Sequence, residues 1–270
     1  MMDELITLFA YTAARYMVSD EADKMVVNTK NENDRDVVTK LELVLNNELK
    51  LATLKYGPNI VFLSEEEKYK QEHLCFEKLT VIINPLDGSQ NYSLGLPFCS
   101  VLIAIVEKRE ILASAVVTSF NHQMIIWSRE KGLWSNGLPS GTYLPSPSYL
   151  AYAPTKTSLN SDIFLKLIQN IDLHSTGLYQ WGSASNGLLE VLNGRLQTFI
   201  GYEIHLRDCV AFIPILLERK IRVAYVIDGL GITLFTSRSA IQFESLVQLF
   251  REDGHIIKEV RDCILEFMYD

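Results

Sequence analysis

One stretch limits the possible folds of this chain more than any other: a largely apolar strand that runs directly into a polar glycine turn. Residues 79–83 read LTVII, and the chain continues as NPLDGSQN. A short apolar run bounded by turn residues indicates a buried strand. Gly88 and Ser89 then read as the start of a helix, whose unpaired backbone N–H groups are suited to hold a phosphate. A structural turn capped by Ser89 is the alternative.

Helical and strand patterns alternate on both sides of this stretch. The N-terminal residues carry apolar side chains at helical spacing, and residues 39–55 form a second amphipathic pattern that Gly57 and Pro58 end. Residues 25–39 read as a hairpin or flap, and residues 99–136 as strands joined by short turns that close on an Asn-Gly pair.

The second half repeats this mixture. Serines and two prolines in residues 140–148 mark a boundary, which predicts an N-terminal half over residues 1–145 and a C-terminal half over 146–270. The predicted strands there are 149–153, 196–200, 222–227 and 231–236, and the predicted helices are 160–169, 183–193, 208–219 and 240–251. Such a mixture of layered helices and strands predicts the α+β class.

Charge and cysteine usage exclude several functions. The formal net charge is −8, and no Arg/Lys block breaks the mixed pattern, so we expect no nucleic-acid partner. An acidic protein that handles phosphate is expected to use a divalent cation. The four cysteines are scattered, which predicts free thiols and a cytoplasmic protein. No apolar run approaches the roughly 18 residues that a membrane span needs, so no membrane partner is expected.

Three acidic side chains stand where predicted elements end. Glu65 closes a short strand, Asp87 follows the strand of residues 79–83, and Asp208 opens an apolar helix. Carboxylates at the ends of neighbouring strands can converge on one point, and such oxygen ligands suit Mg2+. Each has an alternative: a solvated turn for Glu65, a turn signal for Asp87, and a helix N-cap for Asp208.

The same residues lie within a family resemblance. Residues 79–105 resemble the inositol monophosphatase signature, whose core is D-P-[IL]-D-G-[TS]-x-N-[FY]. Five further segments resemble family motifs in the same order: residues 36–39 (DVVT), 62–66 (FLSEE), 131–137 (KGLWSNG), 182–196 (GSA to GRL) and 204–208 (IHLRD). Six ordered motifs agree by chance far less often than one does.

The resemblance implies a layered α/β/α/β/α sandwich and a magnesium-dependent phosphatase. The substrate would be a small phosphate monoester, an inositol phosphate or a related sugar phosphate, hydrolysed by metal-activated water. The family habit of dimerisation implies a homodimer. A nucleotide 3′-phosphatase of the same superfamily fits less well, because Asn91-Tyr92 and the LPF segment that follows resemble the inositol type.

By position, the resemblance also assigns roles to residues. The implied metal ligands are Glu65, Asn84, the Leu86 carbonyl, Asp87 and Asp208. Ser89, Glu42 and Glu65 are the implied catalytic residues, with Ser89 and Glu42 close to the attacking water. The implied phosphate contacts are Asp87, Gly88 and Ser89. The implied substrate contacts are Gly182, Ser183 and Glu203.

Several departures fall near the metals and the substrate. The aspartate that bridges two metals in the family is Asn84, whose amide offers one neutral oxygen and a donor nitrogen. The family's substrate-holding glutamate falls on Gly201, two residues before Glu203. Among the smaller departures, Gln197 stands where the family has an aspartate, and Arg207 where it has a tryptophan. Residues 218–221 lack the family's glycines, and Pro214 predicts a kinked helix.

Two hypotheses follow from the departures. The first is a divergent magnesium-dependent phosphomonoesterase, which the retained Glu65, Asp87, Ser89 and Asp208 favour. The second is a catalytically impaired pseudophosphatase that acts as a dimeric binding or regulatory module, which the change at Asn84 favours. Phosphate release in the presence of Mg2+ separates the two.

Overall fold

The computed structural model describes residues 2–18, 26–29, 37–66, 77–136, 148–152, 162, 165–166, 169, 177–228 and 231–264. The chain forms two compact units. The first comprises Met1–Leu138, Val210–Ile215 and Cys263–Asp270, and the second comprises Pro139–Cys209 and Leu216–Asp262. The predicted boundary near residue 145 and most of the predicted helix over 160–169 lie outside the described residues.

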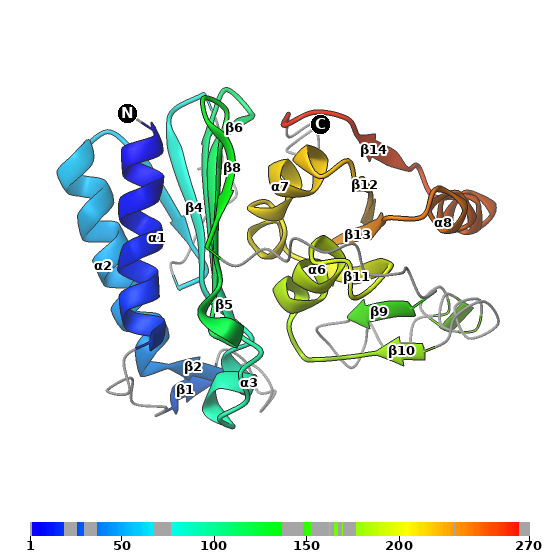
Figure 1. The fold of residues 1–270 in the computed structure, drawn as a ribbon, viewed down its shortest axis with the longest axis horizontal. Coiled ribbons are helices and arrows are strands. Elements are labelled where there is room, and N and C mark those ends of the chain that lie inside the picture. The colour runs from blue at the N-terminus through cyan, green and yellow to red at the C-terminus, as the bar shows by residue number, and fades with distance from the viewer. Residues whose placement is uncertain are drawn as a thin grey trace. The chain divides into compact units, whose positions relative to one another are not determined.

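A six-stranded sheet forms the centre of the first unit (Figure 1). Its spatial order is β3-β4-β5-β6-β7-β8, with β3 and β4 parallel and every other neighbouring pair antiparallel. The strands are β3 (Val61–Ser64), β4 (Thr80–Asp87), β5 (Ser100–Glu107), β6 (Glu110–Thr118), β7 (Met124–Ser128) and β8 (Gly132–Ser135). The predicted run of strands over 99–136 is confirmed.

Two helices, α1 (Met2–Val18) and α2 (Lys40–Tyr56), cover one face of this sheet (Figure 1). The apolar stripe of α1, which includes Leu5 and Phe9, is fully buried and belongs to the same core as Val81 and Ile83 of β4. Burial at helical spacing on α1 and at alternate positions on β4 is what the sequence pattern predicts.

A short antiparallel hairpin lies between these two helices in the sequence. It joins β1 (Val26–Thr29) to β2 (Val37–Thr39), and β2 leads directly into α2. The predicted hairpin is therefore confirmed for the described residues, while most of the flap between its strands lies outside them. None of the helices in the described ranges is long and apolar enough to cross a membrane.

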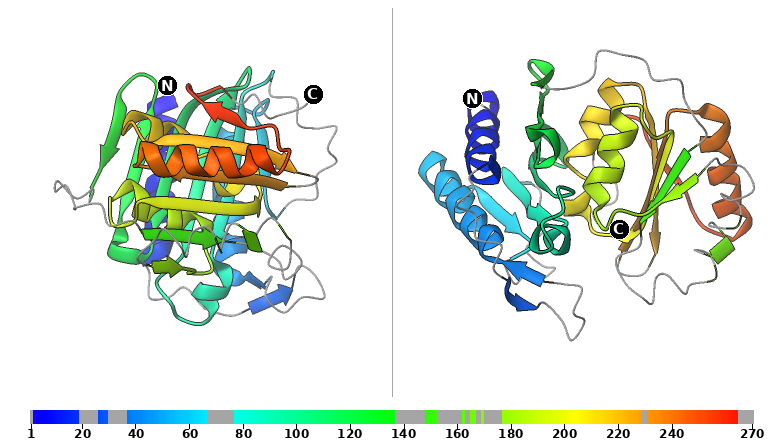
Figure 2. Two further views of the ribbon diagram at one scale, coloured as in Figure 1. Left: turned by 90° about the vertical axis from the view of Figure 1, so that its right-hand side faces the viewer. Right: turned by 60° about the horizontal axis from the view of Figure 1, so that its bottom comes forward.

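The second unit has its own six-stranded sheet, in the order β10-β9-β11-β13-β12-β14. The strands are β9 (Ser148–Tyr152), β10 (Gly177–Tyr179), β11 (Thr198–Ile204), β12 (Arg222–Asp228), β13 (Gly231–Ser237) and β14 (Lys258–Val260). Helices α6 (Ala184–Leu192) and α8 (Ala240–Glu252) lie on opposite faces of this sheet (Figure 2). Helices and mixed sheets in both units confirm the predicted α+β class.

Two of the predicted elements that have different bounds in the structure bear on the site. The strand expected over residues 79–83 continues to Asp87 as β4, so Asp87 ends the strand rather than following it. The helix expected over 208–219 begins only at Phe212, as α7 (Phe212–Glu218), after a 3-10 turn, η3 (Leu206–Asp208). Pro214 therefore lies in the first turn of α7, where backbone N–H groups have no partner within the helix. The predicted kink is wrong for this reason.

Candidate active site

The end of β4 carries an irregularity that positions Asn84 and Asp87. Asn84 pairs with Leu102 of β5 and Asp87 with Ser100, so β4 has one residue more than its partner across this interval. Pro85, which has no N–H to donate, lies inside this bulge, where sheets tolerate proline. The Asn84 Oδ1 accepts a hydrogen bond of 3.2 Å from the Leu86 N–H. Asn84 and Asp87 are both buried.

A left-handed glycine follows Asp87 and starts the short helix α3 (Ser89–Ser93). Gly88 has φ 84° and ψ 35°, a conformation that residues with a Cβ rarely adopt. Its carbonyl accepts from the Tyr92 N–H at 3.0 Å, and Gly88, as the N-cap residue, has no side chain with which to cap α3. The predicted strand, glycine turn and helix start are therefore confirmed in that order.

Glu42 is held at the first turn of α2 by a capping box. The Glu42 Oε2 accepts from the Thr39 N–H at 3.1 Å, and the Thr39 Oγ1 accepts from the Glu42 N–H at 3.3 Å. This reciprocal pair satisfies two backbone donors at the helix start. Glu42 is fully buried, so the capping box fixes a carboxylate inside the protein.

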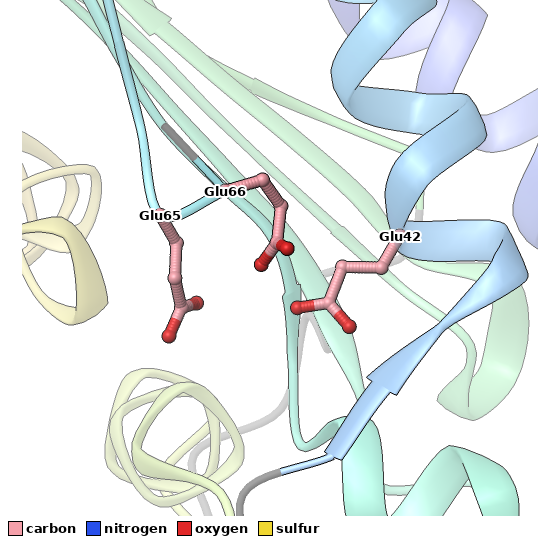
Figure 3. A group of neighbouring side chains, drawn as sticks. All are labelled: Glu42, Glu65 and Glu66. Carbon is pink, nitrogen blue, oxygen red and sulfur yellow. The ribbon is translucent and has the colours of Figure 1, made fainter. Parts of the chain in front are cut away.

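Three carboxylates converge beside the β3–β4 edge of the sheet (Figure 3). One carboxylate oxygen from each of Glu42, Glu65 and Glu66 lies within 4.8 Å of the others. Glu65 and Glu66 directly follow β3 and are half-buried, and the Glu66 N–H donates to the Ser64 Oγ at 3.3 Å. The parallel pairing of β3 and β4 brings the ends of both strands to the same edge of the sheet.

The chemistry of this group fits a divalent cation. Carboxylate oxygens are the hard ligands that Mg2+ takes in proteins. Like charges this close repel one another, and a cation among them relieves that repulsion. Glu65 and Glu42 were predicted site residues, whereas Glu66 was missed; its signal was its place beside Glu65 in an acidic trio.

The predicted ligand Asp208 belongs to the second unit. Its Oδ2 accepts from the His205 N–H at 2.9 Å, across the turn η3. The alternative of an N-cap for the following helix is wrong, because Asp208 lies at the end of η3 and α7 starts at Phe212. Burial, with a smaller effect from the negative charge of Asp208, raises the pKa of the Cys209 thiol. Cys209 is therefore a neutral buried thiol rather than a nucleophile.

The predicted substrate residues Gly182 and Ser183 lie at the start of α6. Ser183 is its N-cap and is fully buried, and its Oγ accepts from the Asn186 N–H at 3.3 Å and from the Asn186 Nδ2 at 2.9 Å. Gly182 has φ 66° and is exposed. The Ser183 hydroxyl thus serves the helix, and the exposed backbone of Gly182 is the part of this pair that faces solvent.

A bulge in β11 separates Gly201 from Glu203. Gly201 pairs with Leu234 and Ile204 with Ile232, so β11 has one extra residue in this interval. Glu203 has φ 52°, an uncommon conformation for a residue with a side chain. A Cβ added to Gly201 would lie 2.9 Å from the Ile204 Cδ1. The position at which the resemblance implies a glutamate is therefore covered by an apolar side chain.

Comparison with known proteins settles the family. The profile described as the inositol monophosphatase family matches residues 2–220, well over half of the chain. The chain belongs to the inositol monophosphatase family. The resemblance in the six motifs is thereby confirmed, and the family and its relatives indicate a phosphatase.

Two curated relatives illustrate the range of this inositol monophosphatase family. The fructose-1,6-bisphosphatase/inositol-1-monophosphatase of Aquifex aeolicus is 22% identical over 198 residues, which cover 71% of this chain and 73% of that protein. The Nus factor SuhB of Xylella fastidiosa is 27% identical over 205 residues, 73% of this chain and 69% of that protein.

The fold is shared with solved structures of the family. One is described as an IMPase/NADP phosphatase complexed with Mg2+ and phosphate; it has a TM-score of 0.76 at 16% identity and covers 94% of this chain and 96% of that one. At this identity the likeness establishes the fold alone. The residue roles inherited by position from the inositol monophosphatase family, those of Asp208, Glu203, Gly182 and Ser183 included, stay predictions.

Proposed function

We propose that this chain is a magnesium-dependent phosphomonoesterase that hydrolyses an inositol phosphate or a related sugar phosphate. The observation that supports it most directly is the convergence of Glu42, Glu65 and Glu66 at the end of β3, the strand that pairs in parallel with β4, which ends at Asp87. The chain belongs to a family of phosphatases and carries a cluster of hard oxygen ligands, and both suit metal-dependent ester hydrolysis.

Each of the proposed site residues has a separate role in the reaction. Glu65 and Asp87 would hold the cation, which when bound neutralises phosphate charge and lowers the pKa of water. The N–H groups of Gly88 and Ser89 would donate to the phosphate oxygens, since the N-cap glycine has no side chain to cap that helix start. Glu42 and Ser89 would orient the attacking water. The water oxygen would bond to phosphorus while the ester P–O bond breaks, and the proton that the water releases would pass to the leaving oxygen, giving the free alcohol and inorganic phosphate.

The substrate pocket is proposed to differ from that of relatives with a glutamate at position 201. The Gly201 position is covered by Phe199 and Ile204, so a substrate hydroxyl finds no carboxylate there. Glu203, set by the bulge in β11, is the proposed replacement contact. We therefore expect sugar phosphates with fewer or differently placed hydroxyls to compete well with inositol phosphate.

The test is phosphate release from a panel of inositol, sugar and nucleotide monophosphates, with and without Mg2+. Wild type is expected to release phosphate only with Mg2+, and Asp87→Asn to lose at least about a hundredfold in kcat, the scale on which electrostatic groups at the reacting atoms act. Asp162→Asn, an exposed aspartate, is the matched control. Full activity of Asp87→Asn would contradict the proposed site. Absence of phosphate release from every substrate by the wild-type chain would contradict the proposed phosphatase activity.

Three further parts belong to the proposal. Ligation by Asp208, homodimer formation and a cytoplasmic location stay predictions. Light scattering of the purified chain tests the dimer: a mass near twice 30.7 kDa is expected, and a mass near 30.7 kDa contradicts it.

A further inference from the structure

The side of α1 opposite its buried stripe carries a short, regular row of exposed residues. They are Glu4, Leu8, Tyr11 and Arg15, spaced by four, three and four positions. This is the spacing of the contact seam in a two-stranded helical pair, and it places the side chains in one line along the helix. Leu8 and Tyr11, at the centre of the row, are 50% and 56% exposed. This side of α1 therefore has the pattern of a helix contact although it is exposed.

The order of charges along this row is self-complementary. Glu4 lies near one end of α1 and Arg15 near the other, roughly 16 Å apart along the axis at 1.5 Å per residue. If a second α1 lies antiparallel on the row, with a two-fold axis between residues 9 and 10, Glu4 of each copy faces Arg15 of the other. The same axis sets Leu8 of each copy opposite Tyr11 of the other. One axis thus satisfies both pairs, as a symmetric contact requires.

A parallel pair of α1 helices would have the opposite electrostatic character. It would set Glu4 against Glu4 and Arg15 against Arg15, and like charges placed together across an interface are unfavourable. The charge pattern of the row therefore favours the antiparallel direction.

The guanidinium of Arg15 is held at the end of the row by its neighbour. Its Nη2 donates to the Tyr16 hydroxyl at 3.1 Å, and its Cζ lies 4.9 Å from the centroid of the Tyr16 ring. A guanidinium has five N–H donors, so this hydrogen bond leaves others for a carboxylate. Arg15 is exposed and is therefore accessible to a second copy of the chain.

Helix α2 widens the apolar part of this face. α1 packs over β5, β6 and β7, and α2 lies beside it over β3 and β4, so the two helices form one layer on the sheet (Figure 1). On the side of α2 opposite its buried stripe, Leu43, Leu51 and Leu54 are exposed. Exposed apolar side chains gathered on one face mark a contact surface. A copy seated on α1 would bring its own α2 toward these leucines.

We propose that the exposed sides of α1 and α2 bind a second copy of this chain, with the two α1 helices antiparallel and Glu4 of each copy paired with Arg15 of the other. The occupant is a second copy because the charge order of the row complements itself when reversed. Leu8 and Tyr11 form the apolar centre, and aromatic side chains are enriched at the centres of interfaces. The inference gives a face to the homodimer of the proposed function, on which it rests, and it is independent of the metal site.

Charge reversal tests both the face and the direction of the pair. Glu4→Arg sets two arginines together at each end of the helix pair, and Arg15→Glu sets two glutamates together. The double variant Glu4→Arg/Arg15→Glu restores opposite charges in the reversed order. Both substitutions act against the dipole of α1, so a dimer that the double variant regains comes from the interface and not from a more stable helix. Arg251→Glu, at an exposed arginine of α8, is the matched control.

Sedimentation equilibrium of the purified full chain at low salt measures the dissociation constant of the dimer, and circular dichroism verifies that each variant is folded. Wild type is expected to form a dimer with a mass near twice 30.7 kDa. Each single reversal is expected to raise the dissociation constant about tenfold, because symmetry makes one substitution change both ends of the contact. The double variant and Arg251→Glu are expected to dimerise as wild type does.

The outcomes separate this inference from the rest of the proposed function. A monomeric wild type would overturn the inference together with the homodimer, and would leave the face to a different partner or to solvent. A dimer that both single variants form as tightly as wild type would overturn the inference alone, because the dimer would then use another face. A double variant as weak as the single variants would contradict the antiparallel pairing. Phosphate release with Mg2+ tests the chemistry separately.

Discussion

Position 201 is a glycine on which two apolar side chains of the second unit pack. Phe199 and Ile204 are fully buried and close over Gly201, and both approach the point where a Cβ would lie, at 3.0 and 2.9 Å. Real Cβ atoms do not tolerate such distances, so any side chain here forces both neighbours to move. The packing of these two neighbours therefore favours glycine at position 201.

We expect Gly201→Ala to destabilise the protein by about 1–3 kcal/mol, the usual cost of overpacking a buried site. Urea unfolding followed by fluorescence measures this loss. Gly57→Ala is the comparison, because its added methyl meets only the half-buried Ile60 at 3.1 Å, and Ile60 has room to turn. An alanine at 201 that costs no more than the one at 57 would contradict this account.

Residue patterns predicted part of the candidate site and missed the rest for a physical reason. Glu65, Asp87 and Gly88 were recognisable because each stands at the end of a strand or in a turn. Glu66 was not, since neighbouring residues in a strand usually point to opposite faces, and only the turn after β3 brings both carboxylates into one group. That turn is set by tertiary structure.

At the scale of elements, an ion pair joins the start of α1 to the turn between β7 and β8. The Lys131 Nζ lies 3.2 Å from the Asp3 Oδ2. A hydrogen bond with Ser128 and the charge of Lys131 hold the pKa of Asp3 below its ordinary value, against the effect of burial. Asp3 also lies in the first turn of α1, where a negative charge is favourable.

This pair gives a pH-dependent contribution to stability. Because the pKa of Asp3 is lowered on folding, the stabilisation is fully present above the unfolded value near 3.9 and is lost as pH falls through the lower folded value. We expect Asp3→Asn to lower stability at pH 7 by about 0.5–1 kcal/mol and to have less effect at pH 3. Denaturant unfolding at both pH values measures this. An equal loss at both values would contradict the linkage.

The elements themselves were largely predictable, and their ends were not. Apolar spacing predicted α1 and α2 because these helices bury a regular stripe, and apolar runs between short turns predicted β5 to β8. The extension of β4 to Asp87 was missed because a proline normally ends a strand, and a bulge accommodates it here. The late start of α7 was missed because η3 uses the carboxylate of Asp208 to close its own turn.

At the scale of the molecule, the two units are not consecutive pieces of chain. Val210–Ile215 and Cys263–Asp270 belong to the first unit, although the second unit separates them from the other first-unit residues. Phe212, Ile213 and Ile215 are buried, and the Ile111 N–H of β6 donates to the Cys263 carbonyl at 2.9 Å. A cut after the first unit's main segment removes these contacts.

We therefore expect residues 1–138 alone to lack cooperative unfolding in urea, whereas the full chain unfolds cooperatively. The fragment leaves apolar surface exposed that Val210–Ile215 would otherwise cover, so it is also expected to bind a hydrophobic dye. Circular dichroism in the near ultraviolet and dye fluorescence measure this. A fragment with native-like aromatic signals and a sharp transition would show that the later segments are dispensable.

The capping box of α2 has one further consequence. The Glu42 carboxylate binds the Thr39 amide and belongs to the acidic group, so fraying of the first helical turn and release of that carboxylate are the same event. A ligand that holds Glu42 in place must then slow the exchange of the Thr39 amide proton with solvent. Deuterium uptake at the Thr39 amide therefore reports whether a ligand occupies the acidic group that contains Glu42.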